Sequence, residues 1–262
     1  MNTSERSTAA GGAGRVRLGM LTPSSNTALE PLTSAMLADV PGVSVHFSRF
    51  RVTEISLSEG ALGQFDDTPI VDAAALLADA RVHAIAWNGT SAGWLGFGAD
   101  ERLCRRITER TGIPATTSVL ALDEIFRSSG VERFGLVTPY LGAVQERIVA
   151  SFRDAGFRCV AERHLDERVN FTFAEVTADQ IAEMVRAVAS ARPQAITTFC
   201  TNLAAADLVA SLEEELGIPI YDTVSTAVWK SLRLAGVDPR LVKGWGRLFD
   251  NGAHRVRSGG RS

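Results

Sequence analysis

The sequence predicts an α/β protein built from two similar lobes, each a Rossmann-like (flavodoxin-like) parallel sheet flanked by helices. Three observations predict this fold. Short apolar runs alternate with longer segments of helical period, the two halves of the chain repeat each other, and small polar residues follow the strands at equivalent points of both halves. We expect the functional site in the cleft between the lobes.

Five apolar runs have the length and β-branched content of strands in a parallel sheet. These runs are residues 16–21, 43–48, 82–87, 134–138 and 194–199. The segments between them carry apolar residues at helical spacing, and several end at a glycine, where a C-cap belongs. The predicted helices are residues 27–39, 68–80, 99–112, 121–130, 141–156, 177–190, 205–217 and 225–236.

The repeat is the most informative feature of the chain. AIAWNGTSAG (84–93) aligns with AITTFCTNLA (195–204), and in each half a helix and then a Gly-Ile-Pro turn follow, with a third strand expected from the Ile-Pro. LGMLTPSSNT (18–27) aligns with FGLVTPYLGA (134–143). A pseudo-twofold axis is therefore predicted. Ligands bind at the carboxyl ends of strands in such sheets, so the turns that follow these strands are expected to converge.

The repeat also sets the expected domain boundaries. We place the N-terminal lobe at residues 15–125 and the C-terminal lobe at residues 126–225, with the segment from about 226 to 250 packing back on the N-terminal lobe. The ends, residues 1–14 and 251–262, lack periodicity and are expected to be disordered tails, the second one basic.

Composition excludes several classes of function. A net charge of −3 with interspersed signs gives no footprint for nucleic acid. No apolar stretch is long enough to span a membrane and the N-terminus lacks a signal-peptide core, so we expect a cytoplasmic protein. No nucleotide-binding motif is present, and the histidines lack the spacing of a metal site. Helix faces rich in Ala and Leu are compatible with a homo-oligomer.

Of the three cysteines, only Cys200 stands at a strand end. The sequence places it at the start of a turn before a helix, where amides and the helix dipole would lower the pKa of the thiol. This setting favours a nucleophile or a proton donor, although a buried structural cysteine stays open. Cys104 and Cys159 lack such a turn and are expected to serve packing.

Hydroxyl-rich turns surround the predicted cleft. Gly89, Thr90 and Ser91 form a small-residue turn of the kind that binds a carboxylate or oxyanion. Tyr140 follows Thr138 and Pro139 in the turn of the other lobe that mirrors residues 23–27. Thr201 and Asn202 align with Thr90 and Ser91, and the turn that holds Ser24 and Asn26 is a further candidate. Helix capping would explain any one of these turns alone. An apolar wall is expected from Trp87, Trp94, Leu141 and Phe199.

These motifs resemble the Asp/Glu racemase superfamily, in the branch of the maleate cis-trans isomerases and arylmalonate decarboxylases. The resemblance runs from about residue 15 to residue 257. It is carried by TPSSNT with Glu30 and Pro31, NGTSAGW, VTPYLGAVQER, FCTN, the Gly-Ile-Pro turns and GWGRLF. It implies an enzyme that acts on a small carboxylate or dicarboxylate between two pseudosymmetric lobes, without a cofactor or a metal.

The resemblance also assigns roles to single residues. Cys200 matches the cysteine of the C-terminal lobe, and Asn26 matches a substrate-binding asparagine of the isomerases. Thr90, Ser91 and Tyr140 match the hydroxyls that hold a carboxylate in the decarboxylase. Gly89 stands where the isomerases and two-base racemases have their first cysteine.

The missing thiol favours a single-cysteine decarboxylase. In this interpretation the hydroxyl turns stabilise an enediolate and Cys200 is the general acid that protonates it. The alternatives are a maleate isomerase or a racemase of the same superfamily, including a member of the type encoded with ectoine-utilisation genes. A non-catalytic protein that binds a carboxylate is a second alternative.

Overall fold

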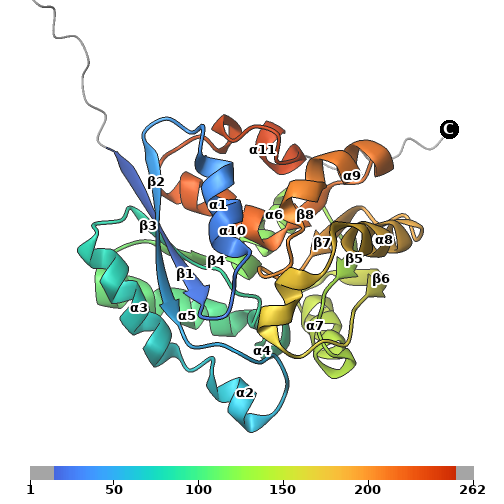
Figure 1. Cartoon of the computed structure of the whole chain (residues 1–262), viewed down its shortest axis with the longest axis horizontal. Coiled ribbons are helices and arrows are strands. Elements are labelled where there is room, and N and C mark those ends of the chain that lie inside the picture. Colours follow the sequence, from blue (N-terminus) through green and yellow to red (C-terminus); the bar gives the residue numbers. More distant parts are fainter. Residues whose placement is uncertain (1–14, 252–262) are drawn as a thin grey trace, which may run out of the picture.

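The computed structural model describes residues 15–251. The predicted N-terminal tail, and the predicted C-terminal tail from residue 252 on, lie outside the described residues. It contains two parallel four-stranded sheets, ordered β2-β1-β3-β4 and β6-β5-β7-β8 (Figure 1). The identical order in two successive halves confirms the predicted α/β fold and its internal repeat. This is the order of the first four strands of a flavodoxin-like sheet.

Each lobe alternates strands and helices in chain order. The N-terminal lobe consists of β1 (Val16–Pro23), α1 (Leu29–Leu37), β2 (Val43–Phe50), α2 (Glu59–Gly63), α3 (Asp67–Asp79), β3 (Ala84–Trp87), α4 (Ala92–Leu95), α5 (Phe97–Thr111), β4 (Ala115–Thr117) and α6 (Ser118–Ser129). The C-terminal lobe consists of β5 (Arg133–Val137), α7 (Gly142–Asp154), β6 (Arg158–Arg163), α8 (Ala178–Ala189), β7 (Ala195–Thr198), α9 (Val209–Leu216), β8 (Ile220–Asp222), α10 (Thr223–Leu234) and α11 (Arg247–Asn251). Short 3-10 turns lie at Asn170–Glu175, Ala206–Leu208 and Pro239–Leu241.

The short helices α2 and α11 were not predicted, and neither were two further features of these elements. The edge strand β6 is half-buried and begins and ends with arginine, so it lacks the apolar run that marks the other strands. The expected helix over residues 99–112 begins earlier and is separated from the short α4 by Gly96, whose φ of 88° interrupts the helical path. Both departures come from local features that weaken the apolar period.

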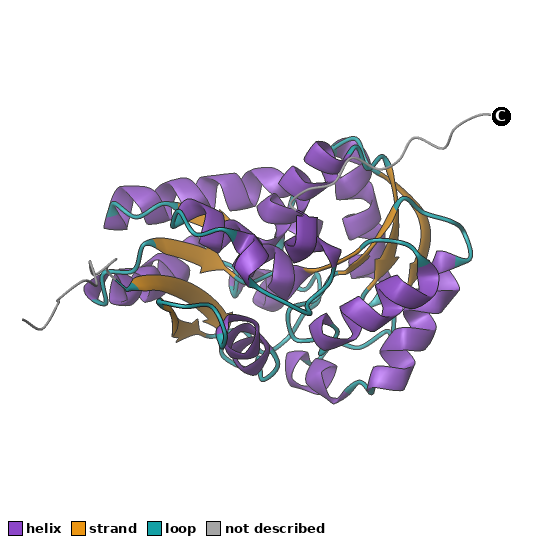
Figure 2. Cartoon of the chain, turned by 90° about the horizontal axis from the view of Figure 1, so that it is seen from above, coloured by secondary structure: helices purple, strands orange, loops and turns teal. Residues whose placement is uncertain are grey.

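The helices α6 and α10 join the two lobes. Thr226 of α10 donates a hydrogen bond of 2.9 Å to the carbonyl of Ser118 in α6. Phe126 of α6 packs into the C-terminal lobe, with its ring centroid 5.4 Å from that of Phe134 in β5. Figure 2 shows the two sheets on opposite sides of a central group of helices. The lobes therefore share a continuous core.

The end of the described chain returns to α9. Glu213, 2% exposed, accepts a hydrogen bond of 2.8 Å from the amide of Ile220 and one of 2.7 Å from the amide of Arg247. Glu213 is therefore a buried carboxyl group that joins α9 to β8 and α11, and burial raises its pKa. Thus α10 contacts the N-terminal lobe through α6, whereas α11 is held by the C-terminal lobe.

Candidate active site

The turns that follow β3 and β7 meet at the interface between the lobes. The hydroxyl of Thr201 donates a hydrogen bond of 3.0 Å to the carbonyl of Asn88, and the hydroxyls of Thr90 and Tyr140 lie 2.6 Å apart. Both contacts join one lobe to the other. The side chains at this junction are almost shut off from solvent, with exposed fractions of 2–4% for Thr90, Tyr140, Cys200 and Thr201.

Ser91 is 4% exposed, and its side chain makes no capping hydrogen bond to the helix that follows it. The Thr90 and Tyr140 hydroxyls carry two protons and use only one in their mutual hydrogen bond, so a further proton is free to donate. The cluster can therefore offer several neutral donors to one bound anion.

Asn26 is placed at this junction but its amide is largely occupied. Its Oδ1 accepts hydrogen bonds from the amides of Ala28 and Leu29 at the start of α1. Its Nδ2 donates to the hydroxyl of Thr201 at 3.2 Å. Asn26 therefore holds the hydroxyl of a second candidate residue in position.

Asn202 also bridges the lobes. Its Oδ1 accepts from the amides of Thr27 and Ala28, at 2.9 and 3.2 Å, and its Nδ2 donates to the carbonyl of Asn170. The side chains of Asn26 and Asn202 thus dock α1 against the C-terminal lobe.

The structure does not bring Ser24 into the buried cluster. Ser24 is exposed, and its hydroxyl accepts a hydrogen bond of 3.1 Å from the amide of Val52. The neighbouring Ser25 accepts a hydrogen bond of 2.8 Å from Nδ2 of Asn170. The Ser24 side chain therefore anchors the segment after β2 and is not placed to bind a ligand with the other candidates.

The environment of Cys200 differs from the predicted helix N-terminus. A turn over residues 201–203 follows it, and α9 begins only at Val209. Burial raises the pKa of the thiol to about 12, while the Tyr140 hydroxyl and the amides of Asn202 and Leu203 act in the opposite direction. The expectation of a lowered pKa is wrong, because burial outweighs the turn amides. A thiol with this pKa keeps its proton at neutral pH.

Tyr140 is held in its protonated form by the same effect. Burial, followed by the nearby Cys200, raises the pKa of its hydroxyl well above the ordinary value. The hydroxyl sits between Thr90 of one lobe and Cys200 of the other. Tyr140 therefore links the thiol to the hydroxyl turn as a neutral donor.

The space beside Gly89 is filled by an indole ring. A Cβ at position 89 would lie 1.9 Å from Cζ2 and 2.3 Å from Cε2 of Trp87, far inside van der Waals contact. Gly89 is not among the glycines with positive φ, so its backbone would accept a side chain. The ring of Trp87 alone excludes a thiol from this position.

The repeat shows how the two lobes diverged. Trp87 aligns with Thr198, and Gly89 aligns with Cys200. The N-terminal lobe thus has a large side chain where the C-terminal lobe has a small one, and no side chain where the C-terminal lobe has a thiol. The Thr198 hydroxyl donates a hydrogen bond of 2.8 Å to the carboxylate of Asp222, the N-cap of α10. Sequence reasoning assigned Trp87 only to an apolar wall. The pairing of Trp with Thr in the aligned repeat was the signal for a special role.

The remaining wall residues differ in placement. Trp94 lies edge-on to Tyr140 with ring centroids 5.5 Å apart, and Phe199 is fully buried. Leu141 is half-buried, as are Cys104 and Cys159. Between residues 15 and 251, no three His, Cys, Asp or Glu side chains are grouped as metal ligands, and no helix has both the length and the apolar character to cross a bilayer.

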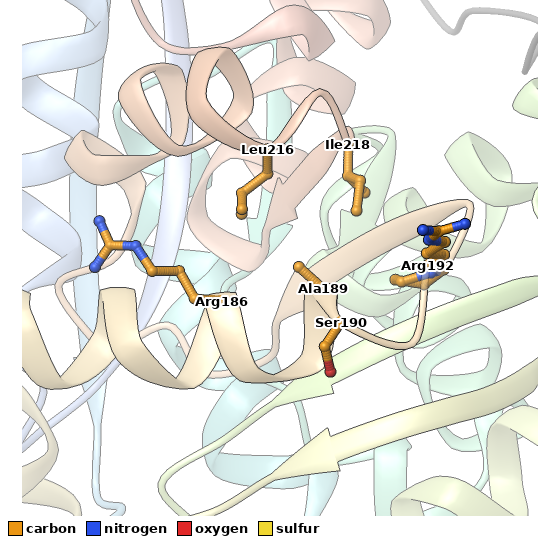
Figure 3. Close-up of a pocket in the computed structure, with 7 residues that line it drawn as sticks. Arg186, Ala189, Ser190, Arg192, Leu216 and Ile218 are labelled. Carbon is orange, nitrogen blue, oxygen red and sulfur yellow. The ribbon is translucent and has the colours of Figure 1, made fainter.

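A separate cavity of about 510 Å³ lies in the C-terminal lobe, beside the ends of α8 and α9 (Figure 3). Arg186 and Arg192 stand at opposite ends of it, and Arg186 already pairs with Glu215 at 2.7 Å. Because Arg192 and Ile218 precede β7 and β8, this cavity is at the amino ends of the strands. It does not belong to the cluster around Cys200.

Comparison with known proteins identifies the family. A family model described as arylmalonate decarboxylase matches residues 18–249. The chain belongs to the arylmalonate decarboxylase family. It is 28% identical over 184 residues to arylmalonate decarboxylase from Bordetella bronchiseptica, which covers 69% of this chain and 77% of that protein. It is also 27% identical over 244 residues to maleate isomerase from Nocardia farcinica, which covers 89% and 95%.

Solved structures of a maleate isomerase and of an arylmalonate decarboxylase share the fold of this chain. A Nocardia farcinica maleate cis-trans isomerase variant with a covalently bound succinylcysteine intermediate superposes with a TM-score of 0.82 at 26% identity, covering 89% of this chain and 98% of that one. Unliganded arylmalonate decarboxylase gives a TM-score of 0.73 at 25% identity, covering 90% and 99%. The relatives are enzymes of two reaction types that act on small carboxylates.

The raised pKa of Cys200 predicts slow alkylation. At about pH 8 a thiol with a pKa of about 12 is thiolate in roughly one molecule in ten thousand. Iodoacetamide should therefore leave Cys200 of the folded protein unmodified while it reacts with the half-buried Cys159, whose pKa is raised only to about 11. Peptide mass spectrometry at successive times measures both rates. Faster labelling of Cys200 would contradict this description of the site.

The overlap at Gly89 predicts a strong coupling with Trp87. Gly89→Ala should lower the free energy of unfolding by about 1–3 kcal/mol, because the new methyl group overpacks the indole. In a Trp87→Ala background the same change should cost much less. Urea denaturation of the two single variants and the double variant gives the coupling energy. Equal costs of Gly89→Ala in both backgrounds would refute the steric argument.

Proposed function

We propose that this protein is a cofactor-independent decarboxylase of a substituted malonate, with Cys200 as the proton donor. The observation that carries the proposal is the pairing of one buried thiol with a glycine whose side-chain space is occupied by Trp87. A site with a single thiol has a proton donor on one face only. Its raised pKa suits a thiol that gives up a proton to a strong base and does not attack carbon.

The neutral donors around Cys200 would bind the carboxylate that remains on the substrate. The Ser91 hydroxyl is not used to cap the helix that follows it, and the Thr90 and Tyr140 hydroxyls use one of their two protons in their mutual hydrogen bond. Charge that develops on this carboxylate as an enediolate forms is stabilised by such fixed donors, more strongly where water is excluded. The exposed fractions of a few per cent at these residues supply that exclusion.

The proposed reaction has two steps. The bond between the α-carbon and one carboxylate breaks, carbon dioxide leaves, and the electron pair stays on the substrate as the enediolate. The Sγ–H proton of Cys200 then moves to the α-carbon and forms the new C–H bond. The resulting thiolate takes a proton from water, which restores the starting state.

A maleate isomerase is the second candidate, favoured by the Nocardia farcinica relative that covers most of this chain. An isomerase that forms a succinylcysteine needs a thiolate to attack its substrate. Gly89 cannot supply one, and burial disfavours the thiolate of Cys200. The decarboxylase proposal requires neither, which is why we prefer it.

The proposal is tested by proton NMR in D2O with phenylmalonate, maleate and aspartate as parallel substrates. Phenylmalonate should disappear and give monodeuterated phenylacetate. Cys200→Ser should lower the rate by roughly 10²–10⁴-fold, because it removes the general acid. Cys159→Ser is the matched control, since this half-buried cysteine of β6 lies outside the site.

The other outcomes are equally informative. Fumarate from maleate, lost in Cys200→Ser, would replace the proposal with an isomerase. Deuterium exchange at the α-carbon of aspartate would point to a racemase. An absence of any reaction, with binding of these carboxylates retained, would support a binding protein instead.

A further inference from the structure

We propose that Trp87 is a substrate-binding residue whose indole N–H donates a hydrogen bond to a carboxylate of the substrate. The inference rests on the proposed function for its ligand, a substituted malonate. It assigns to Trp87 a role beyond that of filling the space beside Gly89.

The first observation is an unpaired donor. Trp87 is 1% exposed, and its Nε1 has no hydrogen-bond partner within residues 15–251. Buried N–H groups are rarely left without a partner, because they lose their hydrogen bonds to water on folding. A ligand that accepts this hydrogen bond would remove the cost. An indole nitrogen only donates, so the ligand atom must be an acceptor.

The second observation is where this donor lies. Atoms of the six-membered ring of Trp87 fill the position that a Cβ on residue 89 would take. Nε1 is bonded to one of them, Cε2, which lies 2.3 Å from that position. Gly89 lies between Asn88, which accepts from Thr201, and Thr90, which contacts Tyr140. The indole nitrogen is therefore beside the turn that carries the hydroxyl donors.

The third observation is that the ring is held in place. Phe50, at the end of β2, packs against Trp87 with ring centroids 4.9 Å apart and planes at 49°. Gly89 leaves room on the side of the turn, whereas any larger residue would push the ring away. A donor whose direction is fixed by packing loses little entropy when it binds an anion, and its hydrogen bond to a carboxylate is charge-assisted.

These observations suggest what the N-terminal lobe gains by having Trp87 beside Gly89 and no thiol. The N-terminal lobe carries an indole ring with a neutral N–H donor in the space that a side chain at position 89 would need. In the proposed reaction the C-terminal lobe supplies the proton that is transferred to carbon. An indole N–H is not acidic enough to protonate the enediolate at neutral pH. Trp87 can therefore bind a carboxylate without adding a second proton donor.

Calorimetric titration of phenylmalonate tests this inference on a Cys200→Ser background, in which turnover is suppressed. Adding Trp87→Phe, which keeps an aromatic ring but removes the donor, should raise the dissociation constant roughly 10- to 100-fold, as expected for a hydrogen bond to a charged group. Trp229→Phe is the matched control, since Trp229 is a buried indole of α10 outside the cluster and should leave the constant unchanged.

A spectroscopic readout measures the donor in a protein that keeps Trp87. In ¹⁵N-tryptophan-labelled Cys200→Ser protein, the chain gives four indole N–H signals, one for each tryptophan. Phenylmalonate should move one of them strongly downfield, and that signal should be the one absent from the Trp87→Phe spectrum. An unmoved Trp87 signal, or an unchanged dissociation constant in Trp87→Phe, would overturn the inference.

The inference and the proposed function fail in different ways. Wild-type decarboxylation together with unchanged binding in Trp87→Phe would refute the role of Trp87 alone. No decarboxylation, but binding of phenylmalonate or maleate that depends on Trp87, would refute the proposed function alone. No binding of either probe would overturn both, because the donor would then have no carboxylate to bind.

Discussion

The contact between the two equivalent turns, one from each lobe, positions everything else at this site. Thr201 donates to the carbonyl of Asn88, and Asn26 in turn donates to Thr201. These buried hydrogen bonds place Cys200 and Gly89, the neighbours of Thr201 and Asn88, at the same interface. A hydrogen bond in such an environment is costly to break, because its partners would be left unsatisfied away from water. The shared helices α6 and α10 then fix the lobes around this contact.

The site departs from the symmetry of its scaffold in the distribution of side-chain volume at two aligned pairs of positions. In the C-terminal lobe a threonine and a thiol follow one another at alternate positions, and in the N-terminal lobe a tryptophan and a glycine stand there. Position 89 cannot regain a side chain unless the indole moves. The single-thiol character is thus a property of two residues together. The same pair leaves the buried indole N–H of Trp87 without a partner in the described part of the chain.

The sequence was sufficient for the fold because the repeat is carried by strand ends, and strand ends are marked by buried apolar runs followed by small polar residues. It was also sufficient to bring Thr90, Tyr140, Cys200 and Thr201 to one place. It failed where the outcome depends on burial in three dimensions. The pKa of Cys200 rises because the sulfur is buried, and Glu213 is buried because α11 returns to cover it. Neither effect has a signature in local sequence.

The contact between Trp87 and Gly89 lies between these two cases. The alignment of Trp with Thr was visible, but the direction of the ring was not, since a tryptophan at a strand end can face either the core or the cleft. The structure turns it over Gly89, and this orientation decides how many thiols the site can hold.

The stereochemistry of decarboxylation tests this account most directly. 2-Methyl-2-phenylmalonate is prochiral, and its decarboxylation product, 2-phenylpropionate, is chiral. One proton donor acting on a fixed substrate should give a single enantiomer, which chiral chromatography of the wild-type product would show. A racemic product formed at the enzymatic rate would contradict the account, because protonation would then reach both faces and Cys200 could not be the only donor.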